Sequence, residues 1–94
     1  MCWIMLDVVL SNRFKKDLKT VAKRGYNLEL LDMVVDKLAN QVQLEEKYKD
    51  HALSGDYSGF RECHIEPDWL LIYRVNDTQL LLFLSRTGTH SDLF

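Results

Sequence analysis

Three strand-like runs joined by two turns make up residues 60–90, which read FRECHIEPDWLLIYRVNDTQLLLFLSRTGTH. The runs are rich in aliphatic and aromatic residues and occupy positions 60–65, 69–75 and 79–85. Short runs of this kind, bounded by Pro, Asn and Asp, are typical of strands connected in hairpins. We therefore predict an antiparallel meander of three strands that ends in a polar tail at residues 86–90.

The order of strands in such a meander brings several functional side chains to one end of the sheet. The first strand ends beside the start of the second strand, which lies beside the end of the third. The side chains expected at this end are His64, Asp68, Trp69, Arg86 and His90. Two imidazoles, a carboxylate, a guanidinium and a large aromatic ring in one place form a candidate active site.

The residues before the meander predict one more strand and two helices. An apolar run at 3–9 is short enough to be a first strand, and Met5 is a candidate for the true start of the protein. Ser11 and Asn27 are suitable N-caps for amphipathic helices over 11–24 and 28–41. The prediction for residues 1–94 is one α+β domain of order β-α-α-β-β-β. Its four-stranded, largely antiparallel sheet carries both helices on one face.

The apolar pattern of the last two strands bears on how the two faces of the sheet are covered. The strands at 69–75 and 79–85 are apolar at nearly every position, and such strands need cover on both faces. Because the two helices can cover only one face, either something else shields the other or a hydrophobic surface is left for a partner.

Residues 42–59 show no periodic pattern of apolar residues and are expected to form a long ordered loop, since they contain several aromatic side chains.

Composition limits the class of protein. The chain is 47% hydrophobic and 28% charged, which is typical of a globular domain. No apolar run is long enough to span a bilayer and no secretory signal pattern is present, so we expect a cytoplasmic protein without membrane contact. Cys2 and Cys63 are expected to be free thiols rather than a disulfide or a metal site.

Charge is distributed unevenly along the chain. The net charge is −2, which argues against a free-standing nucleic-acid binder. Residues 1–27 nevertheless carry six basic and two acidic side chains. The lysines of this segment that fall on the first helix are Lys15, Lys16, Lys19 and Lys23. They are either a local phosphate-binding face or an ordinary solvated helix face.

The candidate active site excludes several kinds of chemistry. The sequence has neither ligand spacing for zinc nor a glycine-rich phosphate-binding motif. A cysteine nucleophile is unsupported, because alternation along a strand points Cys63 away from its neighbours Glu62 and His64. What remains is proton transfer by imidazoles together with stabilisation of an anion by arginine. This inventory fits metal-free RNA cleavage, in which a 2′-hydroxyl attacks the adjacent phosphate.

Three stretches resemble the YafQ branch of the RelE-type toxins, which are ribosome-dependent mRNA interferases of bacterial toxin–antitoxin pairs. They are YKDHALSG at 48–55, RECHIEPDWLLIY at 61–73 and RTGTHSDLF at 86–94. The resemblance implies a RelE-like fold, no cofactor or metal, and cleavage of mRNA in the ribosomal A site. The catalytic residues it implies are His51, His64, Asp68, Arg86 and His90. It also implies substrate contacts by Trp69 and Phe94.

For proton transfer we expect His90 to act as the general acid. The candidates for the general base stay His51, His64 and Asp68.

The same resemblance implies a set of partners. These are a cognate antitoxin, the ribosome with its mRNA, and operator DNA only indirectly through the antitoxin. RelE-type toxins tend to be basic, whereas this chain is slightly acidic, so its affinity for rRNA is expected to depend on the four lysines of the first helix. The alternative is a catalytically silent module that binds an antitoxin and acts as a transcriptional corepressor. The absence of His64, Arg86 or His90 would favour that alternative, and all three are present.

Overall fold

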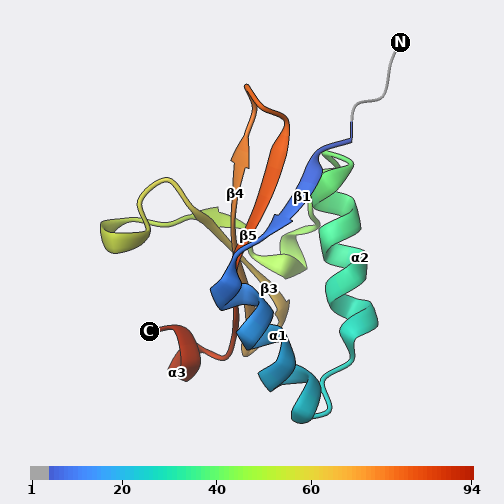
Figure 1. Cartoon of the computed structure of the whole chain (residues 1–94), viewed down its shortest axis with the longest axis vertical. Helices are drawn as coiled ribbons and strands as arrows, with labels where there is room; N and C mark the ends of the chain where they lie inside the picture. The colour runs from blue at the N-terminus through green and yellow to red at the C-terminus, as the bar shows by residue number, and fades with distance from the viewer. Residues whose placement is uncertain (1–4) are drawn as a thin grey trace.

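A five-stranded sheet carries two long helices on one face in the computed structural model, which describes residues 5–94 (Figure 1). The predicted α+β class is confirmed, and the predictions for Met1 and Cys2 lie outside the described residues. The elements are β1 (Asp7–Leu10), α1 (Asn12–Lys23), α2 (Leu28–Ala39), η1 (Glu46–Tyr48), β2 (His51–Ala52), η2 (Gly55–Tyr57), β3 (Arg61–Glu66), β4 (Trp69–Asn76), β5 (Leu81–Gly88) and α3 (His90–Leu93).

The strands follow the order β1-β5-β4-β3-β2 across the sheet. β3, β4 and β5 form the predicted antiparallel meander, and β1 pairs with β5 in parallel. The predicted number of four strands is wrong, because His51 and Ala52 pair with Glu62 and Arg61 to make a fifth strand. Two residues are too few to show a periodic pattern, so β2 was hidden in the segment expected to be a loop.

Both long helices begin directly after the N-cap residues predicted for them. The Ser11 hydroxyl accepts a hydrogen bond from the Phe14 amide at 2.9 Å, and the Asn27 side chain accepts one from the Glu29 amide at 3.1 Å. Each oxygen satisfies an amide that has no partner within the helix. Between the helices, Gly25 has a φ of +81°, a left-handed conformation that glycine adopts without steric cost. No helix in residues 5–94 combines the length and apolar character needed to cross a membrane.

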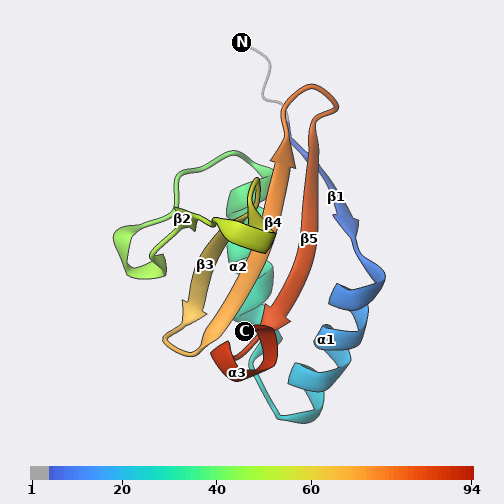
Figure 2. The ribbon, with the colours of Figure 1, turned by 90° about the vertical axis from the view of Figure 1, so that its left-hand side faces the viewer.

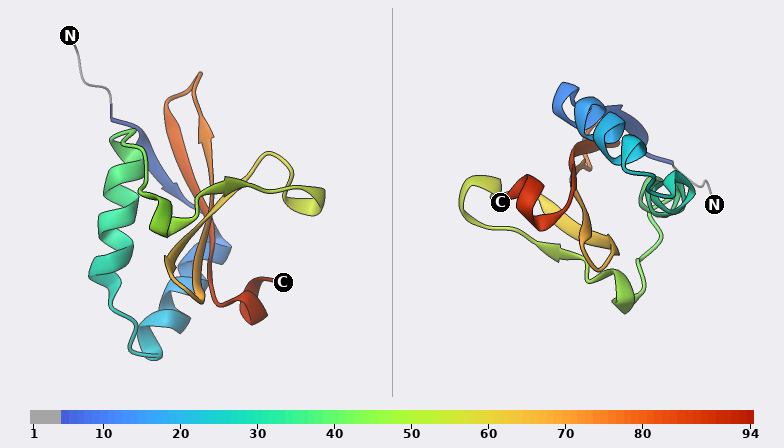
Figure 3. Two further views of the ribbon diagram at one scale, coloured as in Figure 1. Left: turned by 180° about the vertical axis from the view of Figure 1, so that it is seen from behind. Right: turned by 90° about the horizontal axis from the view of Figure 1, so that it is seen from below.

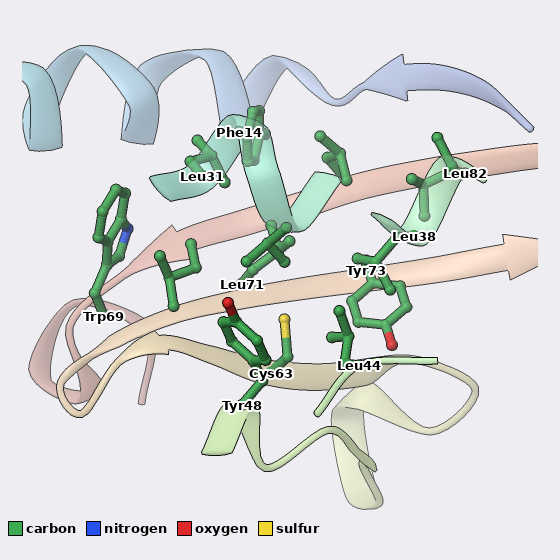
Figure 4. Packing of buried hydrophobic residues seen from close by; sticks show 14 of the residues in the cluster. Phe14, Leu31, Leu38, Leu44, Tyr48, Cys63, Trp69, Leu71, Tyr73 and Leu82 are labelled. Carbon is green, nitrogen blue, oxygen red and sulfur yellow. The ribbon is translucent and has the colours of Figure 1, made fainter. Parts of the chain in front are cut away.

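The main hydrophobic core lies between the sheet and the two helices (Figure 4). Phe14 and Val21 of α1 and Val34 of α2 are each at most 2% exposed. They pack with strand side chains that alternate along β4, namely Trp69, Leu71 and Tyr73. Burying a large aliphatic or aromatic side chain contributes about 1.5–3 kcal/mol, so this layer fixes the helices to the sheet.

The opposite face of the sheet is covered by the chain itself. Leu70 and Ile72 of β4 are fully buried there against Leu93 of α3. The side chains of Leu53, Tyr57 and Phe60, from the segment between β2 and β3, complete this second cluster. Figures 2 and 3 show that segment and α3 on the side of the sheet away from α1 and α2. The apolar pattern of β4 therefore requires no partner to cover this face.

The C-terminal tail is more ordered than predicted. β5 continues to Gly88 and is followed by α3, where the sequence suggested only a polar tail. Thr89 accepts a hydrogen bond from the Asp92 amide while the Asp92 side chain accepts one from the Thr89 amide, which is a capping box. The sequence Thr89-His90-Ser91-Asp92 matches this motif, so the start of α3 could have been predicted from the sequence.

Candidate active site

The face of the sheet opposite the long helices carries most of the predicted site. In the strand register His64 lies opposite Leu70, and Arg86 lies opposite Ile72. Residues paired across neighbouring strands share a face, so His64 and Arg86 lie on the side of the second cluster. His51 on β2 is opposite Glu62, which pairs with Ile72, and therefore shares that side too.

α3 brings His90 to the turn between β3 and β4. Its Nδ1 lies 2.6 Å from Asp68 Oδ1, and its backbone amide donates to the same oxygen at 3.1 Å. The imidazole centroids of His64 and His90 are 5.7 Å apart, and those of His51 and His64 are 6.4 Å apart. The expected gathering of His64, Asp68 and His90 is confirmed, and His51, which strand pairing had not placed, joins them.

Hydrogen bonds fix the same tautomer on all three histidines. Nδ1 of His51 lies 2.7 Å from the Lys49 carbonyl oxygen, and Nδ1 of His64 lies 3.2 Å from the Pro67 carbonyl oxygen. Carbonyl and carboxylate oxygens only accept, so each Nδ1, including that of His90 against Asp68, carries a proton and donates it. We infer that Nε2 is the nitrogen that exchanges a proton in each ring.

Asp68 is bound to His90 in a way that favours its ionised form. The hydrogen bond from the His90 ring, followed by that from the His90 amide, holds the pKa of Asp68 below its ordinary value. The carboxylate is therefore charged at neutral pH and orients the His90 ring. This geometry suits Asp68 as the partner of an acid–base histidine rather than as a general base itself.

Glu62 is a site residue that the sequence analysis missed. Its carboxylate is buried beneath two imidazoles, with Oε1 3.6 Å from His51 Nε2 and 3.5 Å from His64 Nε2. Its position in the strand could have predicted this placement, because residues two apart in a strand, such as Glu62 and His64, lie on the same face.

Arg86 is paired with a residue that the sequence analysis also missed. Its Nε and Nη2 donate to the two carboxylate oxygens of Asp17 on α1 at 2.7 and 3.2 Å. Both side chains are mostly buried, at 15% and 13% exposure. The hydrogen bond with Asp17 is the main cause that raises the pKa of Arg86, and the Tyr57 hydroxyl adds to it. The guanidinium is thus held rather than freely mobile.

The two aromatic residues predicted to bind substrate have different environments. Phe94 is 65% exposed at the end of the chain and meets Tyr57 edge-on, with ring centroids 5.8 Å apart. Trp69 is 1% exposed, donates from Nε1 to the Thr87 hydroxyl at 2.9 Å and packs against Tyr26. The substrate contact that the resemblance implies for Trp69 does not fit this placement, because the alternation of β4 points its ring into the main core.

Cys63 takes no part in the site. It is fully buried on the side of the main core, and burial raises the pKa of its thiol to about 12. A thiolate nucleophile at this position therefore does not form at neutral pH. Among residues 5–94, no group of three or more His, Cys, Asp or Glu side chains is arranged to hold a metal ion.

The position of α3, and with it His90, depends on an ion pair and a glycine. Arg24 at the end of α1 binds Asp92 of α3 through two hydrogen bonds of 2.6 and 3.0 Å. A Cβ atom at Gly88 would come within 2.8 Å of Asp92 Oδ2, so a side chain there would displace Asp92, whose carboxylate completes the capping box of α3. Glycine at this position lets α3 fold back to place His90 beside Asp68.

Comparison with known proteins gives close matches over almost the whole chain. Residues 6–94 match the family described as "Bacterial toxin of type II toxin-antitoxin system, YafQ". The mRNA interferase toxin YafQ of Escherichia coli K12 is 41% identical over 92 residues, which cover 97% of this chain and 98% of the relative.

Solved structures agree with these matches. A metal-bound toxin from Helicobacter pylori superposes with a TM-score of 0.90 at 49% identity, covering 96% of this chain and 100% of that one. YafQ in the Escherichia coli DinJ–YafQ toxin–antitoxin complex superposes with a TM-score of 0.87 at 41% identity, covering 97% and 99%.

Proposed function

This chain belongs to the YafQ family of bacterial toxins of type II toxin–antitoxin systems, and from that premise we propose how it acts as an mRNA interferase. It cleaves mRNA in the ribosomal A site, with no metal cofactor, by attack of a 2′-hydroxyl on the adjacent phosphate. The observation that carries this proposal is the group of three imidazoles on one face, each with Nδ1 held by an acceptor.

The reaction needs two proton transfers and a group that stabilises negative charge. A base removes the proton of the 2′-hydroxyl, whose oxygen bonds to phosphorus. The bond from phosphorus to the 5′-oxygen then breaks as an acid protonates that oxygen. We assign the acid to His90, which Asp68 orients, and the base to His51 or His64, which flank Glu62. Arg86 stabilises the charge that develops on the phosphate, and Phe94 offers an open ring for stacking on a base.

We propose that the ribosome is recognised through α1. Lys15, Lys16, Lys19 and Lys23 are all exposed, and none of them forms an ion pair within the described part of the chain. Their ammonium groups are therefore free to bind phosphates of rRNA, although the whole chain carries a net charge of −2.

Reversing two of these charges, as in Lys16→Glu with Lys19→Glu, should weaken binding to ribosomes. It should also reduce the slope of log affinity against log salt by about one for each rRNA phosphate that a lysine no longer neutralises. A binding assay over a range of salt concentrations measures both quantities. The matched control is Lys16→Arg with Lys19→Arg, which changes the same two positions and keeps their charge. If the charge-reversed variant behaves like this control at every salt concentration, α1 is only a solvated helix face.

We propose a cognate antitoxin as the second partner, with operator DNA reached only through it. Crystal structures of relatives contain such a complex of DinJ with YafQ. In this chain, β1 is an edge strand whose Val8, Val9 and Leu10 side chains are 42%, 36% and 37% exposed. An edge strand with an apolar surface favours binding of an extended segment from a partner.

The proposed function is tested by inducible expression in a bacterium, with mapping of mRNA 5′ ends. The intact chain should stop growth and create new 5′ ends within translated codons, and co-expression of the cognate antitoxin should restore growth. The His90→Ala variant should permit growth at an equal level of protein. A catalytically silent corepressor would instead leave growth and the mRNA ends unchanged with either form, and that result would contradict the proposal.

A further inference from the structure

The Asp17 carboxylate joins α1 to the end of β5. It accepts from Nε and Nη2 of Arg86 and also from the Thr87 amide, which donates to Oδ2 at 3.2 Å. Three donors therefore converge on one mostly buried carboxylate. Two charge-assisted hydrogen bonds along one edge of a planar guanidinium fix its orientation as well as its position.

The backbone around Arg86 supports this arrangement. Ile72 pairs with Arg86 but the next residue, Tyr73, pairs with Leu84, so Ser85 is an extra residue in β5. Such a bulge turns the following side chain away from the regular direction of the strand. The Ser11 hydroxyl donates to the Ser85 carbonyl oxygen at 2.8 Å, which ties the start of α1 to the bulge.

α1 is placed to reach this part of β5. β1 pairs with β5 only from Leu81 to Leu84, and beyond that point α1 runs beside the strand (Figure 2). α1 is thus attached to β5 twice, at its N-cap through Ser11 and near its middle through Asp17. Asp17 is the one acidic residue of α1, whose other charged side chains are basic.

We propose that Asp17 is a positioning residue for Arg86 in RNA cleavage, an inference that rests on the proposed function. Asp17 holds the edge formed by Nε and Nη2, so that Nη1 lies outside the ion pair and can be directed at a phosphate oxygen. The carboxylate also offsets part of the positive charge, which weakens attraction for the phosphate of the bound substrate. Orientation of Arg86 is then settled before the transition state forms, where its hydrogen bond matters most.

Single-turnover cleavage of mRNA on programmed ribosomes, with the toxin in excess, tests the proposal through Asp17→Asn. This variant keeps the shape of the side chain and removes its charge. We expect the maximal rate to fall about five- to tenfold, because a loosened group loses its alignment. The toxin concentration at half-maximal rate should stay the same or decrease. A decrease in apparent affinity with an unchanged maximal rate would overturn the positioning role.

A double variant shows whether Asp17 acts through Arg86. If it does, adding Asp17→Asn to Arg86→Ala should change the rate by no more than about twofold. A further loss as large as that of Asp17→Asn alone would mean that Asp17 acts independently, and the proposal would fail. Asp32→Asn, the same substitution on an exposed position of α2, is the matched control and should cleave at the rate of the intact chain.

A spectroscopic measurement separates this proposal from the proposed function. The Nε–H of Arg86 is held by Asp17, so NMR of the intact chain should show a slowly exchanging arginine Nε–H signal. Arg86→Ala assigns the signal by removing it, and Asp17→Asn should broaden or abolish it while the melting temperature stays close to that of Asp32→Asn. An unchanged signal in Asp17→Asn overturns the restraint of Arg86 even if cleavage is slowed. Loss of the signal supports it even if the intact chain fails to cleave mRNA.

Discussion

Replacing His90 with alanine should lower the single-turnover rate of mRNA cleavage by roughly 10²–10⁴-fold, the usual contribution of a general acid or base. Asp68 accepts hydrogen bonds from Nδ1 of the ring at 2.6 Å and from the backbone amide of His90 at 3.1 Å, so Nε2 is the nitrogen presented to a leaving group. An acid is needed because an unprotonated 5′-oxygen is a strongly basic leaving group. Without His90 that oxygen must leave unprotonated or take its proton from water.

An RNA with sulfur at the 5′-bridging position tests this assignment, because a thiolate leaves without a proton. Its cleavage by His90→Ala should approach the rate of the intact chain. A defect as large as that on ordinary RNA would contradict the role of acid and leave His90 as a base or a structural residue. Ser91→Ala is the control on the same helix, since Ser91 is exposed and lies next to His90, and it should cleave both substrates normally.

The meander and the gathering of His64, Asp68 and His90 could be predicted because both follow from local rules. Turn residues fix where the strands end, and antiparallel pairing then fixes which ends are neighbours. The role of Trp69 was harder to predict from the same pattern. Alternation places Trp69, Leu71 and Tyr73 on one face of β4, but it does not reveal which face the helices cover.

The contacts that sequence reasoning missed join residues far apart in the chain. Asp17 and Arg86 are 69 positions apart, and their pairing depends on how α1 lies beside β5. The amphipathic pattern of α1 places Asp17 at the border of the buried face of that helix, but no local sequence pattern identifies Arg86 as its partner. Glu62 is different, because its spacing from His64 alone indicates a shared face.

Replacing Arg86 with alanine should lower the single-turnover rate by about tenfold to a hundredfold, since a hydrogen bond to a charged group is worth roughly 1.5–3 kcal/mol. Arg86→Lys should recover only part of this loss. An ammonium group carries its three donors on a single nitrogen, so it cannot hold Asp17 through two nitrogens of a planar fork while a third nitrogen faces a phosphate oxygen. If Arg86→Lys cleaves as fast as the intact chain, a point charge is sufficient and the planar fork has no role.

The alanine variant has a second effect that must be separated from catalysis. It leaves Asp17, which is only 13% exposed, without its ion-pair partner, and an uncompensated carboxylate in such a place destabilises the fold. The double variant Asp17→Asn with Arg86→Ala removes that charge while the guanidinium stays absent. A rate that remains low in the double variant, with a melting temperature restored toward that of the intact chain, identifies the loss as one of transition-state stabilisation. Recovery of the rate together with the melting temperature would show instead that Arg86 supports the fold and that the phosphate is stabilised elsewhere.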